Sequence, residues 1–169
     1  MNKTPIIQLI NVEKTFGPHK ILCGVNLSVP EGKTTVIVGG SGQGKSVIIK
    51  HILGLVQPDS GSILINGKDI NRLKKKELRE IRSHFGVLFQ NAALFDSMTV
   101  FDNVALPLRE RTRFTEKEIM GIVNDKLALM DVAGSNEKYP AQISGGMKKR
   151  VGLARALVLN PKIVFFDEP

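Results

Sequence analysis

The chain has 169 residues, a formal net charge of +8 and an apolar fraction of 42%, which fits one globular domain with a sizeable core. A single cysteine, Cys23, excludes an internal disulfide, and no apolar stretch approaches the roughly 20 residues that span a bilayer. The basic residues are spread out without interleaved aromatics and tryptophan is absent, so the charge indicates a solvated basic surface rather than a nucleic-acid site.

The first elements in chain order are predicted strands. Residues 6–12 and 25–29 are typical of a half-exposed sheet, and Phe16-Gly17-Pro18 forms a turn between them. In this polar setting Phe16 can stack on an adenine ring, although a lone aromatic is more often part of a core. A turn at residues 30–33 then leads into a strand predicted at residues 34–38.

A glycine-rich motif follows that predicted strand. Its pattern is G-x-x-x-x-G-K-S, and its residues are Gly39, Gly40, Ser41, Gly42, Gln43, Gly44, Lys45 and Ser46. Between a buried strand and a helix this pattern binds phosphate, because the glycines turn backbone N–H groups inward and the helix adds its positive end. We expect Lys45 to reach the β- and γ-phosphates and Ser46 to hold Mg²⁺, with Val47 also at the nucleotide. The alternative is a glycine-rich turn without a ligand.

The elements after this loop are shorter. A helix is predicted at residues 46–55, and residues 57–61 end it with turn chemistry. Asn66-Gly67 lies between two short strands, at residues 62–65 and 68–70, and is a strong hairpin signal. Residues 73–82 form a basic helical stretch, and residues 86–89 form a short apolar strand that ends at Gln90.

Residues 91–141 read as an all-helical insert. Thr115 and Glu118 form a capping box at the start of one helix, and Gly134 marks its end. Its apolar stripe at helical spacing consists of Ile119, Ile122, Val123, Leu127 and Met130. Ser144 is a suitable N-cap for a long helix over residues 144–159. We therefore expect an α/β fold in which a helical insert interrupts a strand–helix core.

Two acids follow the last apolar run. Residues 163–166 suit a strand buried on both faces of a parallel sheet, and Asp167 and Glu168 come at its carboxyl end. Ligands of open α/β sheets bind at such ends. Asp167 is therefore expected to hold Mg²⁺ through water, and Glu168 to accept a proton from an attacking water. The alternative is a pair of surface acids in a turn.

The motifs in this order resemble the nucleotide-binding domain of ABC transporters. They are the glycine-rich loop, Gln90, Ser144-Gly145-Gly146-Met147 and Asp167-Glu168. The resemblance implies an α/β P-loop NTPase (RecA-like) fold, with a parallel-sheet core, an N-terminal antiparallel β subdomain and a helical insert. Within one ABC ATPase domain, residues 1–90 hold the β subdomain and the phosphate loop, residues 91–141 the helical subdomain, and residues 142–169 the signature helix and the last strand.

The resemblance also implies roles, cofactors and partners. Phe16 matches the aromatic that stacks on adenine, and Gln90 the glutamine that contacts Mg²⁺ and the attacking water. Ser144, Gly145 and Gly146 match the signature that closes over the γ-phosphate bound by a second copy. ATP and Mg²⁺ are thus the implied cofactors, with Lys45, Gln90 and Glu168 in the hydrolysis site. The implied partners are membrane-spanning permease subunits and a head-to-tail second copy, with no nucleic acid.

A finer resemblance concerns residues 89–100, 103–108 and 144–151, which include Met147 and are similar to the ATPases of bacterial Mla-type phospholipid transporters. Amino-acid importers share residues 99–108 but usually keep glutamine where this chain has Met147. The resemblance therefore favours phospholipid transport at the cytoplasmic face of the bacterial inner membrane, with a lipid-binding accessory protein as a further partner. The alternatives are an amino-acid importer ATPase, a soluble ABC-type ATPase acting on nucleic acid or the ribosome, and a nucleotide-binding module without hydrolysis.

The family pattern continues beyond the second acid, with another strand and a histidine that orients the γ-phosphate. His19, His51 and His84 all precede the acids. We therefore expect a C-terminally truncated domain whose sheet leaves a central strand at an edge, and which binds ATP better than it hydrolyses it.

Overall fold

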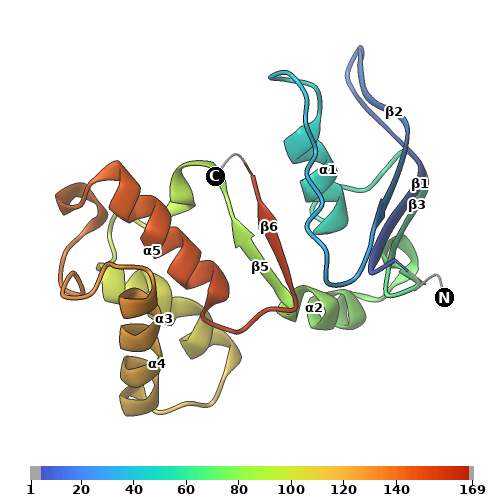
Figure 1. Cartoon of the computed structure of the whole chain (residues 1–169). Helices are drawn as coiled ribbons and strands as arrows, with labels where there is room; N and C mark the ends of the chain where they lie inside the picture. Colours follow the sequence, from blue (N-terminus) through green and yellow to red (C-terminus); the bar gives the residue numbers. More distant parts are fainter. Residues whose placement is uncertain (1–4, 168–169) are drawn as a thin grey trace. The chain divides into compact units, whose positions relative to one another are not determined.

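A computed structural model describes residues 5–167, so the predicted base Glu168 lies outside the described residues. The chain divides into two compact units, unit 1 over residues 1–82 and unit 2 over residues 83–169 (Figure 1). The division of the domain into residues 1–90, 91–141 and 142–169 stays a prediction.

Unit 1 is built on a four-stranded antiparallel sheet in the order β2-β1-β3-β4. β1 (Ile7–Phe16) pairs with β2 (His19–Val29) on one side and with β3 (Ser60–Ile65) on the other. Apolar side chains of these strands form the core of the unit, and six of them are at most 2% exposed: Ile7, Leu9, Val12, Leu22, Ile63 and Ile65. The predicted N-terminal antiparallel sheet is confirmed, and both of its first strands are longer than their apolar patterns indicated.

The turn between β3 and β4 (Lys68–Asp69) is the predicted hairpin. Asn66 and Gly67 have φ angles of 49° and 75°, as a two-residue type I′ turn requires. At the start of β3, Gly61 has a φ of +88°, and a Cβ built there would lie 2.4 Å from the carbonyl oxygen of Asn11. Only glycine fits where β3 crosses this irregular part of β1.

Two helices and a short 3-10 turn, η1 (Ile70–Arg72), complete unit 1. α1 (Lys45–Ile52) begins directly after the glycine loop, and α2 (Lys75–Ser83) is the predicted basic helix. Arg82 donates from Nε to the carbonyl oxygen of Leu53 at 2.7 Å and from Nη2 to that of Gly54 at 2.6 Å. The Arg82 guanidinium thus donates to carbonyl oxygens at the C-terminal end of α1. The last carbonyl groups of a helix have no donor within the helix itself, so they need such a partner.

The strand predicted at residues 34–38 is absent, and this prediction is wrong. These residues have no regular secondary structure, and Val36 and Val38 are 74% and 89% exposed. A buried strand needs ladder hydrogen bonds to neighbours and cover on its faces. No other segment among residues 5–167 pairs with this one, so its apolar composition alone does not make it a strand.

Unit 2 contains a parallel pair of strands. β5 (Phe85–Leu88) pairs with β6 (Ile163–Phe166), and Leu88 lies opposite Phe166. Both predicted strands are confirmed. The prediction that β6 is buried on both faces is wrong, because Phe166 is 48% exposed and β5 is the only strand beside β6 within residues 5–167.

The helices of unit 2 are α3 (Val100–Arg111), α4 (Glu116–Leu129) and α5 (Gly145–Leu157), with 3-10 turns η2 (Gln90–Ala93) and η3 (Pro140–Gln142). They enclose one apolar core whose members are at most 8% exposed: Val100, Val104, Ala105, Leu108, Ile119, Val123, Leu127, Val132, Ile143, Val151, Ala154 and Val158. The predicted helical region is therefore confirmed.

The ends of α4 separate a correct prediction from a wrong one. The capping box at its start is confirmed, because Thr115 accepts from the Glu118 N–H while the Glu118 carboxylate accepts from the Thr115 N–H at 2.7 Å. The predicted end at Gly134 is wrong, since the helix ends at Leu129. Asp131 takes the left-handed conformation, with a φ of 54°, and Val132 N–H returns to the Leu127 carbonyl, which closes the helix earlier.

Candidate nucleotide site

The glycine loop of unit 1 leads directly into α1. Gly42 and Gly44 have φ angles of 77° and 88°, which glycine adopts without strain. Gly44 is also packed on β2, because a Cβ there would lie 3.0 Å from Cγ2 of Ile21 and 3.2 Å from Cδ2 of Leu22. Gly44 is the N-cap of α1, so the positive end of the helix dipole faces the loop.

Lys45 folds back across the loop that precedes it. Its Nζ donates to the carbonyl oxygens of Gly39 at 3.0 Å and Gly40 at 2.7 Å. The side-chain oxygen of Gln43 accepts from the Gly40 N–H at 2.8 Å. These bonds curl the loop around the Lys45 ammonium at the N-terminus of α1. The ammonium and the positive end of the helix dipole both attract a phosphate group.

Other predicted nucleotide contacts lie near this loop or at the same end of unit 1. Ser46 and Val47 are half-buried in the first turn of α1, and Ser41 is exposed in the loop. Phe16 ends β1 at the β1–β2 turn, which lies at the same end of unit 1 as the glycine loop (Figure 1). Phe16 is 44% exposed, and the Lys14 ammonium lies 5.4 Å from the centroid of its ring. The residue is therefore accessible at the surface of unit 1, as stacking on a ligand requires.

Gln90 and Asp167 lie at the same edge of the β5–β6 pair in unit 2. Asp167 follows β6 and donates its N–H to the Leu88 carbonyl oxygen at 3.0 Å, while Gln90 lies two residues beyond Leu88. The parallel register therefore brings an amide and a carboxylate to one carboxyl edge. Such oxygens are ligands that Mg²⁺ accepts in proteins.

Ser144 caps the N-terminus of α5, as predicted. Its Oγ accepts from the Met147 N–H at 3.2 Å. Ser144, Gly145 and Gly146 are exposed, and a Cβ built on either glycine would have no atom within 4 Å. The first turn of α5 contains no acidic residue, so this helix end offers an uncovered positive pole to an anion.

The predicted site residues are divided between the two units. Phe16 and the glycine loop belong to unit 1, whereas Gln90, Ser144 and Asp167 belong to unit 2. Within unit 2, α5 runs antiparallel to β5, because Gly152 approaches Leu88 while Ala156 approaches Gly86. The Ser144 end of α5 therefore lies toward the edge that carries Gln90 and Asp167.

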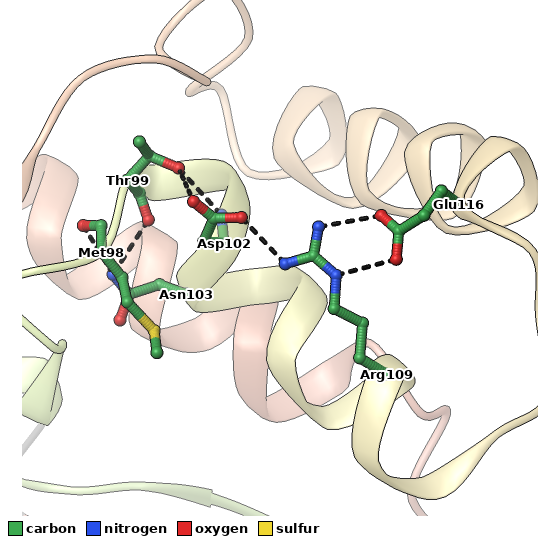
Figure 2. Close-up of polar contacts among 6 residues, drawn as sticks. All are labelled: Met98, Thr99, Asp102, Asn103, Arg109 and Glu116. Carbon is green, nitrogen blue, oxygen red and sulfur yellow. Dashed lines mark hydrogen bonds and ion pairs between the residues drawn. The ribbon is translucent and has the colours of Figure 1, made fainter.

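Asn103 was not among the predicted functional residues, and it is fully buried in α3. Its Nδ2 donates to the carbonyl oxygens of Phe95 at 3.1 Å, Met98 at 3.2 Å and Thr99 at 2.9 Å, and its Oδ1 accepts from the Phe95 N–H at 2.8 Å. Figure 2 shows the Asn103 amide beside Met98 and Thr99, whose carbonyl oxygens accept from it. Asn103 lies among apolar residues at helical spacing, a polar interruption that marks a structural amide.

Arg109 joins α3 to α4 (Figure 2). Its guanidinium holds both carboxylate oxygens of Glu116, at 3.0 and 2.8 Å, and one of Asp102 at 2.9 Å. Hydrogen bonds from Arg109 and Thr99 lower the pKa of Asp102, and the hydrogen bonds from Arg109 lower that of Glu116. The bidentate contact fixes how the two helices of the insert lie against each other.

The sequence profile of the ABC transporter family matches residues 22–169. The chain belongs to the ABC transporter family. Three solved ABC transporter structures, two of them of the cassette MJ0796, have the same fold, which confirms the predicted P-loop NTPase architecture. The ATP-binding cassette MJ0796, solved as a dimer in a post-hydrolysis state bound to ADP and Pi, is similar with a TM-score of 0.88 and 34% identity, over 96% of this chain and 74% of that one.

The curated relatives that the chain resembles are named as ATP-binding proteins of transport systems. It is 52% identical to the probable ribonucleotide transport ATP-binding protein mkl of Mycobacterium tuberculosis, over 96% of this chain and 45% of that protein. It is 43% identical to the intermembrane phospholipid transport system ATP-binding protein MlaF of Haemophilus influenzae, over 97% of this chain and 62% of that protein. The resemblance to ABC cassettes and to Mla-type ATPases is thus confirmed.

The ABC chain spans about half the length of the mycobacterial relatives that it matches. Within residues 5–167, no helix has both the length and the apolar composition that crossing a bilayer requires.

Proposed function

We propose that this protein is the ATP-binding and ATP-hydrolysing subunit of an ABC transporter. The observation that carries the proposal is the glycine loop, where Lys45 Nζ is held by the carbonyls of Gly39 and Gly40 at the N-terminus of α1. This loop suits the triphosphate of ATP, with backbone N–H groups and the ammonium as donors. Phe16 is the proposed stacking partner of the adenine ring.

The residues proposed for hydrolysis come from the strand ends of unit 2 and from α1. Ser46, Gln90 and Asp167 would hold Mg²⁺, and their hydroxyl, amide and carboxylate oxygens fit that ion. When bound, Mg²⁺ supplies positive charge that stabilises the transferring phosphoryl group. Glu168, the proposed general base, follows Asp167, and Gln90 would orient the attacking water.

The proposed partners are a second copy and membrane-spanning permease subunits. The exposed N-terminus of α5 at Ser144, Gly145 and Gly146 suits the γ-phosphate of a nucleotide held by a second copy. The dimeric MJ0796 cassette, which is 35% identical, supports this arrangement. The helices of residues 91–141 would dock on permeases at the cytoplasmic face of the bacterial inner membrane.

The proposed substrate is a phospholipid. The names of the MlaF relatives and Met147 in the signature support it, and a lipid-binding accessory protein would then be a further partner. Ribonucleotide transport is a second candidate, because the mycobacterial mkl proteins named for it are 52% identical to this chain.

The decisive experiment uses the complete gene product. Lys45→Ala is expected to abolish ATP binding, because it removes the ammonium from the loop. Glu168→Gln is expected to bind ATP and to accumulate as an ATP-bound dimer, measured by size-exclusion chromatography with nucleotide quantification. Normal ATP turnover by the Gln variant would exclude Glu168 as the base. Absence of ATP binding by the unmodified protein would refute the proposal.

The substrate is tested separately. The complete protein is purified together with the membrane subunits that accompany it, and the bound small molecules are identified by mass spectrometry. Phospholipid is the expected result, whereas a bound ribonucleotide other than the ATPase nucleotide would favour the second candidate.

A further inference from the structure

The turn η2, which begins at Gln90, contains two alanines in an unfavourable backbone conformation. Ala92 and Ala93 have φ angles of 63° and 45°, in the left-handed region that residues with a Cβ rarely adopt. Each such residue costs about 1–2 kcal/mol. Strain of this size persists only where the surroundings hold the backbone in place.

Arg155 supplies that hold from α5. Its Nη2 donates to the carbonyl oxygens of both strained residues, Ala92 at 2.7 Å and Ala93 at 2.9 Å. Its Nη1 lies 3.5 Å from Oδ1 of Asn103, and its guanidinium carbon lies 5.9 Å from the ring centroid of Phe95. One side chain of α5 therefore contacts the turn, the loop after it and the buried amide of α3.

The acceptors of Arg155 in this cluster are uncharged. They are two backbone carbonyls and one side-chain amide oxygen, and burial of the half-buried guanidinium lowers its pKa. A planar fork of donors matches this set of carbonyls, whereas a lysine ammonium offers no such plane. The contacts at this position therefore depend on the planar geometry of the arginine side chain.

Gly152 brings the same face of α5 against the same turn. A Cβ built on Gly152 would lie 2.7 Å from the Ala92 Cβ and 2.9 Å from Cδ1 of Leu88. Gly86 of β5 is equally close to α5, since its Cβ would lie 2.4 Å from the carbonyl oxygen of Ala156. The strand before η2 and the turn itself are therefore seated directly on the helix backbone.

We propose that Arg155 is a positioning residue that fastens the Gln90–Ala93 turn to α5, so that Gln90 and Ser144 move as one piece. α5 is one continuous helix from Gly145 to Leu157, so Arg155 and the Ser144 cap belong to a single secondary-structure element. This inference rests on the proposed function, in which Gln90 serves the chain's own nucleotide and Ser144 the nucleotide of a second copy. Arg155 then couples the two nucleotide sites of the dimer.

The fastening is tested first without reference to ATP. In the complete gene product, Arg155→Met is expected to raise hydrogen exchange at the amides of Ala92 and Phe95 by about tenfold, which is 1.4 kcal/mol of lost protection. Arg150→Met is the matched control on the same helix, because Arg150 is exposed and donates to the Asp131 carbonyl oxygen, at 3.4 Å, instead of to the η2 turn. Unchanged exchange in Arg155→Met refutes the inference, whether or not the protein is an ATPase.

The coupling is tested by kinetics on the same variants. Arg155→Met is expected to keep the ATP dissociation constant within about twofold, to lower kcat by about tenfold or more, and to bring the Hill coefficient for ATP from above 1 to about 1. Loss of thermal stability alone, with kcat and the Hill coefficient unchanged in the folded protein, overturns the inference. If Arg155→Met does not fold, Arg155→Lys replaces it under the same criteria.

A rescue variant separates positioning from general stabilisation. Glycine adopts positive φ without strain, so Ala93→Gly in the Arg155→Met background is expected to recover part of the lost kcat. Ala93 is exposed, so its methyl group contributes little packing. Failure of the glycine to recover any kcat overturns the role assigned to the strained turn.

Discussion

The helical core of unit 2 and the glycine loop of unit 1 are each stabilised by a different kind of interaction. In unit 2, apolar side chains from α3, α4 and α5 meet in one core where most members are almost fully buried. The loop buries little and is held by backbone carbonyls, the Lys45 ammonium and the Gln43 amide. We therefore expect substitutions in the core to change the free energy of unfolding, and substitutions in the loop to change nucleotide binding.

The largest effect on unfolding is expected from the core. Leu127→Ala removes a fully buried side chain of α4 and should destabilise the protein by about 2–5 kcal/mol, because it loses burial and leaves a cavity. Leu129→Ala on the same helix is the control, since Leu129 is 68% exposed and should cost less than about 0.5 kcal/mol. Chemical denaturation measures both, and equal losses would contradict the difference.

A somewhat smaller effect is expected from the buried amide of α3. Asn103→Leu keeps the volume of the side chain but leaves the carbonyl oxygens of Phe95 and Met98 without the amide donor. The expected loss is about 2–3 kcal/mol by chemical denaturation. Asn124→Ala removes an exposed amide that bonds Asn136 and should stay within about 0.5 kcal/mol. An unchanged free energy of unfolding in Asn103→Leu would show that the segment of residues 95–99 does not depend on the amide.

The contact between α3 and α4 should give a smaller, pH-dependent effect. The folded pKa values of Asp102 and Glu116 are lowered, so their stabilisation is complete above the ordinary carboxyl pKa near 4 and is lost as the pH falls through the lowered values. Arg109→Gln should remove up to about 1 kcal/mol near neutral pH through the Asp102 pair. As the pH falls below about 4, the free energy of unfolding of the Arg109→Gln variant should decrease less steeply than that of the unmodified protein. An unchanged acid profile, followed by circular dichroism, would contradict this assignment.

The smallest effect on unfolding is expected at the loop, where the comparison is sharpest. Lys45→Ala should change the free energy of unfolding by less than about 1 kcal/mol, because its bonds to Gly39 and Gly40 are solvent-exposed. The same variant should lose ATP binding, measured by nucleotide fluorescence titration. Lys50→Ala, in the last turn of α1, is the matched control and should retain binding. A large loss of stability in Lys45→Ala would remove the distinction between loop and core.

Local signals in the sequence predicted much of this fold. The capping box of Thr115 and Glu118, the Asn66-Gly67 turn and the Ser144 cap each depend on residues no more than three positions apart, and all three are present. The order of the motifs carried the family resemblance, which implied the fold and the roles of the site residues. The strand predicted at residues 34–38 was wrong because pairing depends on neighbours that an apolar pattern does not specify.

The contacts of Arg155 could not be predicted from the sequence. They join residues about sixty positions apart, and their acceptors are backbone carbonyls that every residue possesses. The left-handed conformation occurs at two alanines rather than at glycine or asparagine, so the residue types at these positions do not predict it. The tight approach of Gly152 likewise becomes visible only when α5 and the turn are seen together.

The uncovered segment around Val36, Ile37 and Val38 has a practical consequence for solubility. These three consecutive β-branched side chains are 74%, 37% and 89% exposed, and they form an aggregation-prone segment that can pair with the same segment of another molecule. When residues 36–38 are exposed in solution as they are in the structure, light scattering by the protein should increase with protein concentration. A lysine in place of Val38 should keep such a solution clear for longer.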